Sequence, residues 1–250
     1  MYFIGVDHHK QSSVLTVLDE QGRELKSGRV TNHREKVGRF LEDYEPFLAV
    51  LEAGQSSYVM ADLLRELGGE VKMANALQVK LIARARIKTD KRDSRTLARL
   101  LRSGDIPEVY QRGEANRRAQ RVLRLRAFRV AKQTELKNKI RALLAQQREP
   151  IRLEVEKRET GLFSPKGLEW LDHVALPGPD KLVLDDLVEG YREGQAHLAK
   201  TDGIVKSLYE TNEEARRIDT VPGFGTTLSL LMAVEIADIG RFETAAHLHS

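Results

Sequence analysis

Four acidic residues stand at positions that suit metal-dependent chemistry. Asp90 and Asp93 lie three residues apart in the basic segment KTDKRDSRTLARLL. Asp7 closes the apolar run YFIGV, and Glu52 closes the apolar run FLAVL. A spacing of three predicts that Asp90 and Asp93 share one face of a helix that begins at residue 89 or 90. Alone the pair has an ordinary explanation, because aspartates at a helix start interact favourably with the macrodipole.

The four acids can form one site if the strands that end at Asp7 and Glu52 are neighbours in the sheet. A charged residue that ends a buried strand is either solvated or placed at the sheet edge where ligands gather in α/β folds. If the strands that end at Asp7 and Glu52 are adjacent, these acids meet, and the helix with the aspartate pair can close over them. Clustered carboxylates repel one another unless a multivalent cation neutralises them, and Mg²⁺ or Mn²⁺ prefers oxygen ligands. Two such ions, about 3.5 to 4 Å apart, can support phosphodiester cleavage.

Two histidines adjoin the first acid. His8 and His9 follow Asp7 directly and could ligate a metal. Neighbours on a strand point to opposite faces, so at most one of the two can join the acids.

Positive charge is concentrated around and after these acids. The chain has a net charge of only +4, yet residues 80–102 carry nine Lys and Arg against two aspartates, and residues 116–148 carry eleven against Glu135. Such segregation predicts that the middle of the chain faces a polyanion, with nucleic acid favoured over the alternative of a merely solvated helix surface. The candidate contacts are Arg84, Arg86, Lys88, Lys91, Arg92, Arg117, Arg118, Arg121 and Arg124.

Composition excludes several other classes. With 250 residues and 41% hydrophobic residues, the chain can form one large domain or two modest ones. It has no cysteine, so a disulfide framework and a thiolate zinc site are excluded and any metal must be held by oxygen or imidazole. We expect a cytoplasmic globular protein, because neither a secretory leader nor a run of roughly 18 apolar residues occurs in the sequence.

The elements that must position the acids follow from hydrophobic periodicity. A meander of three antiparallel strands is followed by alternating helices and strands, which predicts an α/β fold with a mixed five-stranded sheet. The predicted strands are 2–9, 12–20, 22–30, 46–54 and 68–75, and the predicted helices between them are 33–44 and 56–67.

After residue 76 the pattern is helical. Helices are predicted at 76–85, 90–103 and 114–148, while residues 151–178 receive no assignment. Apolar positions with heptad spacing run from Leu184 to Tyr209. These long segments predict a coiled-coil-like hairpin that packs within the chain or on a second protomer.

Three segments in this order, FIGVDHHK, LEAGQSSY and KTDKRDSRTLARLL, resemble the Asp, Glu, Asp, Asp signature of the DEDD transposases of insertion sequence one-ten type. The resemblance implies a RuvC-like RNase H fold for the N-terminal domain and Mg²⁺ or Mn²⁺ as cofactor. The catalytic, metal-binding tetrad that it implies is Asp7, Glu52, Asp90 and Asp93.

The resemblance also implies partners. Lys10, Gly54 and Tyr58 fall on accompanying motif positions, and Lys10 joins the candidate nucleic-acid contacts. Members of this family are also known as bridge-RNA-guided recombinases. The implied partners are therefore DNA, a guide RNA and further copies of the chain as a dimer or tetramer joined through the helical region, at the nucleoid of a prokaryotic cytoplasm.

The end of the sequence resembles the start of the same family's second transposase domain. In TVPGFGTTLSLLMAVEIADIGRF, Gly223 and Gly225 would expose backbone N–H groups at the start of a helix from Thr226, which predicts an anion site. The alternative is a helix-start turn without a ligand. In the family a serine nucleophile follows beyond a Gly-Leu-x-Pro stretch; Ser250 precedes that point, so we expect a truncated chain that cannot complete recombination by the family's route.

Three parts are predicted: a RuvC-like DEDD domain over 1–110, a basic helical region over 111–215, and the start of a C-terminal transposase domain over 216–250. The predicted function is a DNA transposase or recombinase. A RuvC-like resolvase without a guide RNA and a non-catalytic nucleic-acid-binding scaffold stay open as alternatives. A sugar kinase or actin-like ATPase is disfavoured, because His8, His9 and Lys10 replace the phosphate-cradling glycine turn of that fold.

Overall fold

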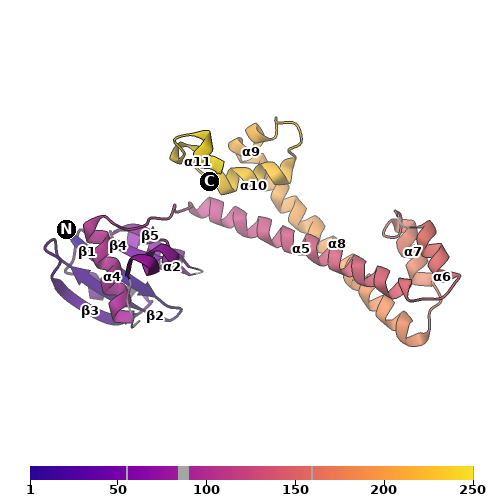
Figure 1. The fold of residues 1–250 in the computed structure, drawn as a ribbon, viewed down its shortest axis with the longest axis horizontal. Coiled ribbons are helices and arrows are strands. Elements are labelled where there is room, and N and C mark those ends of the chain that lie inside the picture. Colours follow the sequence, from indigo (N-terminus) through magenta and orange to yellow (C-terminus); the bar gives the residue numbers. More distant parts are fainter. Residues whose placement is uncertain (55, 84–89, 159, 250) are drawn as a thin grey trace. The chain divides into compact units, whose positions relative to one another are not determined.

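The computed structural model describes residues 1–54, 56–83, 90–158 and 160–249, with only the backbone of Ala83, Lys91 and His249. The chain divides into two compact units, Met1–Gln111 and Arg112–Ser250 (Figure 1). Within the described residues, no helix combines the length and the apolar character needed to cross a membrane.

The first unit is a mixed five-stranded sheet with helices, as predicted. The strand order is β3-β2-β1-β4-β5; β1 pairs antiparallel with β2 and parallel with β4. The strands are β1 (Tyr2–His8), β2 (Ser12–Leu18), β3 (Glu24–Thr31), β4 (Phe47–Glu52) and β5 (Glu70–Ala74). The helices are α1 (Arg34–Leu41), α2 (Ser57–Glu66), α3 (Ala76–Ala83) and α4 (Asp90–Ser103).

Each face of this sheet buries its own apolar cluster. Alternate residues of a strand point to opposite faces, so Ile4 and Val6 of β1 face one side. There they pack in a core with side chains of α1 and α2, such as Val37 and Leu64. The opposite face, which includes Val50 of β4, packs against α3 and α4 through side chains such as Val79, Leu97 and Leu101.

Helix α4 lies directly on the central strand β1. Gly5 has no side chain, and a Cβ built there would meet the carbonyl oxygen of Ser94 at 1.8 Å and the backbone nitrogen of Ala98 at 2.5 Å. Beside this contact, the hydroxyl groups of Thr16 and Ser94 form a buried hydrogen bond of 2.8 Å. The missing Cβ therefore allows the helix backbone to reach the strand, and the first turn of α4 lies beyond Gly5 toward the carboxyl end of β1.

The second unit is helical, as the pattern after residue 76 predicts for this part of the chain. Residues 151–178, which received no assignment, contain two short helices; Leu162 is buried between them and Leu171 is buried within the second. The helices are α5 (Glu114–Ala145), α6 (Ile151–Lys157), α7 (Pro165–His173), α8 (Gly178–Glu210), α9 (Glu213–Ile218), α10 (Thr226–Ile236), the 3₁₀ helix η1 (Ile239–Arg241) and α11 (Ala245–His249).

The two long helices α5 and α8 pack on each other within the chain (Figure 1). Ile140 and Leu144 of α5 share one buried cluster with Leu184 and Val188 of α8. A second cluster joins Ala119 and Leu123 of α5, Val205 of α8, and residues of α9 and α10. The boundary predicted at 215/216 stays a prediction.

We predict that Gly5→Ala disrupts the first unit. The added methyl group overlaps backbone atoms of α4, which cannot rotate away, so the free energy of unfolding should fall by about 3 kcal/mol or more. Denaturant titration measures this loss. Gly54→Ala is the matched control, because a Cβ there has no atom within 4 Å and should change stability little. Equal stability of the two variants would contradict the close packing of α4 on β1.

Candidate metal centre

Asp7 and Glu52 end two adjacent parallel strands. The register of β1 and β4 pairs Tyr2 with Phe47 and continues to Val6 with Leu51, so Asp7 and Glu52 are the next residues along each strand. Residues at the same register position of neighbouring strands point to the same face, and the strands lie about 4.8 Å apart. The predicted adjacency of these two strand ends is therefore present in the sheet.

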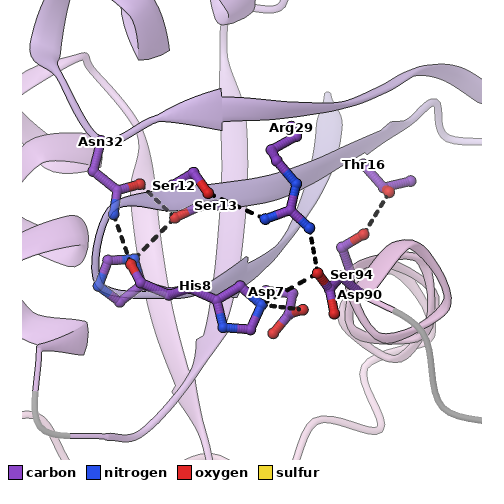
Figure 2. A network of polar contacts seen from close by, with 10 residues as sticks. Asp7, His8, Ser12, Ser13, Thr16, Arg29, Asn32, Asp90 and Ser94 are labelled. Carbon is purple, nitrogen blue, oxygen red and sulfur yellow. Dashed lines mark hydrogen bonds and ion pairs between the residues drawn. The ribbon is translucent and has the colours of Figure 1, made fainter.

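The start of α4 brings Asp90 to the same place. Nε2 of His9 lies 3.2 Å from Oδ2 of Asp7 and 3.5 Å from Oδ2 of Asp90, and one ligand atom from each of the three residues lies within 4.8 Å of the others. Figure 2 shows Asp7 and Asp90 beside each other at the start of α4. The sheet contributes Asp7 and the helix contributes Asp90, as the sequence predicts.

The other two acids lie outside this group. Among the residues that the structure describes, the set of ligand atoms close enough to hold one metal ion is that of Asp7, His9 and Asp90. Asp93 occupies the first turn of α4 together with Asp90, and Glu52 ends β4. Both are partly buried and both make interactions of their own. The tetrad of four metal-binding acids stays a prediction.

Arg29 is a residue of this site that the sequence motifs do not reveal. Asp7 pairs with Val14 across β1 and β2, and Val14 pairs with Arg29 across β2 and β3, so Arg29 faces the same side as Asp7. Its guanidinium forms an ion pair with Asp90 and donates a hydrogen bond of 3.1 Å to the hydroxyl of Ser12 (Figure 2). This hydrogen-bonded cation holds the pKa of Asp90 below its usual range. Arg29 lies on the side of Asp7 because of the register of the three strands, and no motif in the sequence displays that register.

His8 points away from the group of Asp7, His9 and Asp90 and takes part in a hydrogen-bond network. The amide nitrogen of Asn32 donates to the carbonyl of His9 (2.7 Å), so its amide oxygen is left to accept from the Ser13 hydroxyl (2.7 Å). Ser13 has a single proton, so it must accept from Nδ1–H of His8 (2.9 Å). Nε2 of His8 then accepts from the hydroxyl of Ser56 (3.1 Å). The network thus selects one neutral tautomer of His8.

The His8 network links the strand ends beside the candidate metal ligands. It joins the ends of β1, β2 and β3 to Ser56, which precedes α2 and follows Glu52 by four residues. Burial lowers the pKa of His8, in agreement with a neutral ring. The expectation that at most one of the two histidines joins the acids is met, and His9 is the one that does.

The predicted nucleic-acid contacts are distributed over both units. Lys10 is exposed in the turn after β1, and Arg92 is exposed on α4. Arg84, Arg86 and Lys88 lie outside the described residues, as does the side chain of Lys91.

On α5 the four predicted arginines differ in their surroundings. Arg117 donates to the carbonyl of Arg112, and Arg118 forms an ion pair with Glu114. Arg121 and Arg124 are exposed. Of these four arginines, the last two are therefore the best placed to meet a phosphate backbone.

The glycines of the predicted anion turn flank the start of α10. Gly223 has a φ of 93°, in the left-handed region that glycine adopts without strain, and Gly225 is the N-cap of α10 with no side chain to cap it. The helix begins at Thr226, as expected. Anion binding at this turn stays a prediction.

Comparison with known proteins gives the family. The family model DEDD_Tnp_IS110, described as transposase, matches residues 4–148. The chain belongs to this DEDD transposase family. It is 23% identical over 253 residues to the putative transposase y4qE of Sinorhizobium fredii and 22% identical over 242 residues to the transposase for insertion sequence element IS1328 of Yersinia enterocolitica. These matches cover 98% and 94% of this chain but only 61% and 68% of the two relatives.

The residues of the candidate metal centre fall within the family match. Asp7, His9, Arg29 and Asp90 all lie between residues 4 and 148. The matched part also includes α5, which carries the exposed arginines. Membership therefore applies to the segment that holds both the acids and the basic helix.

We predict that His8→Ala destabilises the first unit by about 1 to 2 kcal/mol, because the buried Ser13 loses a hydrogen-bond partner. His8→Asn should recover part of the loss, since its amide nitrogen takes the place of Nδ1. Denaturant titration compares the three proteins. An asparagine variant as unstable as the alanine variant would contradict the assigned tautomer.

Proposed function

We propose that this chain carries the metal-dependent catalytic domain of an insertion-sequence transposase and acts on DNA phosphodiester bonds. Its first unit would then be a RuvC-like RNase H domain. The observation that supports this most strongly is the meeting of Asp7 and Asp90, contributed by a central strand and by a helix far away in the sequence. A non-catalytic scaffold with acids that only cap a helix gives no reason for that meeting.

Each residue of the centre has a distinct task in this proposal. Asp7 and Asp90 bind Mg²⁺ or Mn²⁺, and Glu52 and Asp93 complete the tetrad from the neighbouring strand and the same helical turn. Arg29 holds the Asp90 carboxylate in place through its ion pair. Divalent ions at such a site activate water and stabilise the leaving oxygen.

The helical unit supplies the polyanion surface in this proposal. Arg121 and Arg124 bind phosphates along α5, and the turn at Gly223 and Gly225 adds an anion site. By resemblance to the family, the partners are DNA, a bridge RNA and further copies of the chain, in a prokaryotic cytoplasm. A RuvC-like resolvase without a guide RNA uses the same metal centre and differs in the RNA alone.

We predict that Asp7→Asn abolishes metal-dependent cleavage. Loss of a metal-binding carboxylate removes several kcal/mol of transition-state stabilisation, which corresponds to a fall in rate of about 100-fold or more. The measurement is nicking of duplex and branched DNA with Mg²⁺ or Mn²⁺. Asp43→Asn, an exposed acid in the same unit, is the control and should keep full activity. A wild-type protein that binds DNA but cleaves none of these substrates would favour the scaffold.

We predict that the double charge reversal Arg121→Glu with Arg124→Glu weakens nucleic-acid binding to about the same extent whatever the nucleotide sequence. The slope of log affinity against log salt should also fall by about one for each phosphate that the protein no longer neutralises. Binding is measured on duplex DNA and on structured RNA over a range of salt concentrations. Lys200→Glu with Lys206→Glu, two exposed cations on α8, changes the net charge equally and is the matched control. Equal effects of the two pairs would mean that only net charge matters.

A further inference from the structure

We propose that His9 is a third ligand of the metal centre and that its imidazole makes the site prefer Mn²⁺ to Mg²⁺. This inference rests on the proposed metal-dependent function. It adds a nitrogen ligand that the four-acid pattern does not contain, and it predicts which divalent ion the protein uses.

The distances from His9 to the two acids match neighbouring positions around one ion, and one ligand atom of each of the three residues lies within 4.8 Å of the others. With metal–ligand distances of about 2.1 Å, adjacent ligand atoms of an octahedral ion lie about 3 Å apart, and those of a tetrahedral ion about 3.4 Å apart. Nε2 of His9 lies 3.2 Å from the carboxylate of Asp7 and 3.5 Å from that of Asp90. An ion can therefore bind all three with small movements.

The main chain holds His9 on both sides. Its N–H donates a hydrogen bond of 3.2 Å to the carbonyl of Ser12, and its own carbonyl accepts one of 2.7 Å from Asn32. Within β1, alternation directs His8 to the face opposite Asp7, and His9, in the turn after β1, places its ring beside the Asp7 carboxylate. The ring is thus presented to the acids by a braced backbone, as a preorganised ligand requires.

The site is open enough for an ion to keep other ligands. The side chains of Asp7, His9 and Asp90 are 21%, 48% and 41% exposed. Coordination positions on the solvent side can therefore hold water or a phosphate oxygen. Such an open site is what chemistry on a bound phosphodiester needs.

The charges around the site favour Mn²⁺. Mg²⁺ relies on hard oxygen ligands, whereas imidazole suits transition metals. Arg29 forms an ion pair with Asp90 and so offsets part of the negative charge that attracts a hard cation. Neutral imidazole adds a donor atom without adding charge. The affinity of this site should therefore depend less on negative charge and more on the metal–nitrogen bond, which is stronger for Mn²⁺ than for Mg²⁺.

A different role for His9 makes the opposite prediction. If the ring only pairs with the two carboxylates and competes with the ion, its removal frees both oxygens, and the affinity for Mg²⁺ and Mn²⁺ should rise together. If the ring is a ligand, its removal weakens Mn²⁺ binding much more than Mg²⁺ binding. The direction in which Mn²⁺ affinity changes when the His9 ring is removed therefore separates the two roles.

The test measures Mn²⁺ binding to the whole chain by electron paramagnetic resonance, with Mg²⁺ as competitor. We expect His9→Ala to weaken Mn²⁺ binding about 10-fold or more and Mg²⁺ binding less than about 3-fold. Spin-echo modulation from a directly bound nitrogen should appear in the wild type and vanish in the variant.

His9→Gln is a second variant in case the first does not fold. His33→Ala, an exposed histidine whose side chain does not cap α1, is the control.

The outcomes separate this inference from the proposed function. Unchanged or stronger Mn²⁺ binding in His9→Ala, or no nitrogen modulation in the wild type, would overturn His9 as a ligand. If Asp7→Asn still loses the ion, the metal-dependent function stands without His9. If neither Asp7→Asn nor His9→Ala affects binding, the metal centre itself is refuted.

Discussion

The contact of α4 with Gly5 is the constraint on which the candidate site depends. Successive helix residues turn by about 100°, so a shift of one residue along α4 would rotate Asp90 away from the sheet. The overlap-free fit of the Ser94 and Ala98 backbone over Gly5, together with the Thr16–Ser94 hydrogen bond, selects one position of the helix on the strand. The location of Asp90 beside Asp7 follows from that fit.

The meeting of two carboxylates has an electrostatic cost, and the Arg29 cation offsets part of it. Arg29 reaches Asp90 from β3, two strands away from Asp7, and His9 lies close to both acids. Both are held by hydrogen bonds within the same unit: Arg29 donates to the hydroxyl of Ser12, and the main chain of His9 is bonded to Ser12 and Asn32. These interactions keep the two acids together, and under the proposed function they would also hold the acids in position around an ion.

Much of this fold could be predicted from the sequence, because apolar alternation and turns are local signals. Arg29 could not be found in this way, since its role depends on the register Asp7–Val14–Arg29 across three strands, and no single strand displays its pairing. Alternation also predicts that only one of His8 and His9 can join the acids, but which one depends on where the strand ends. In the structure β1 ends at His8, and His9 follows in the turn and returns to the face of Asp7.

The basic helix α5 shows why net charge alone overstates a binding surface. Arg126 donates to Asp202 of α8 at 2.7 Å, and Arg129 donates to the carbonyl of His197 and to Thr201. These cations stabilise the pairing of α5 with α8 and are not all available to a phosphate. Arg121 and Arg124 lie outside that pairing and are exposed. The arginines of α5 thus divide into those that pair with α8 and those that are exposed, and under the proposed function only the exposed group determines the salt dependence of nucleic-acid binding.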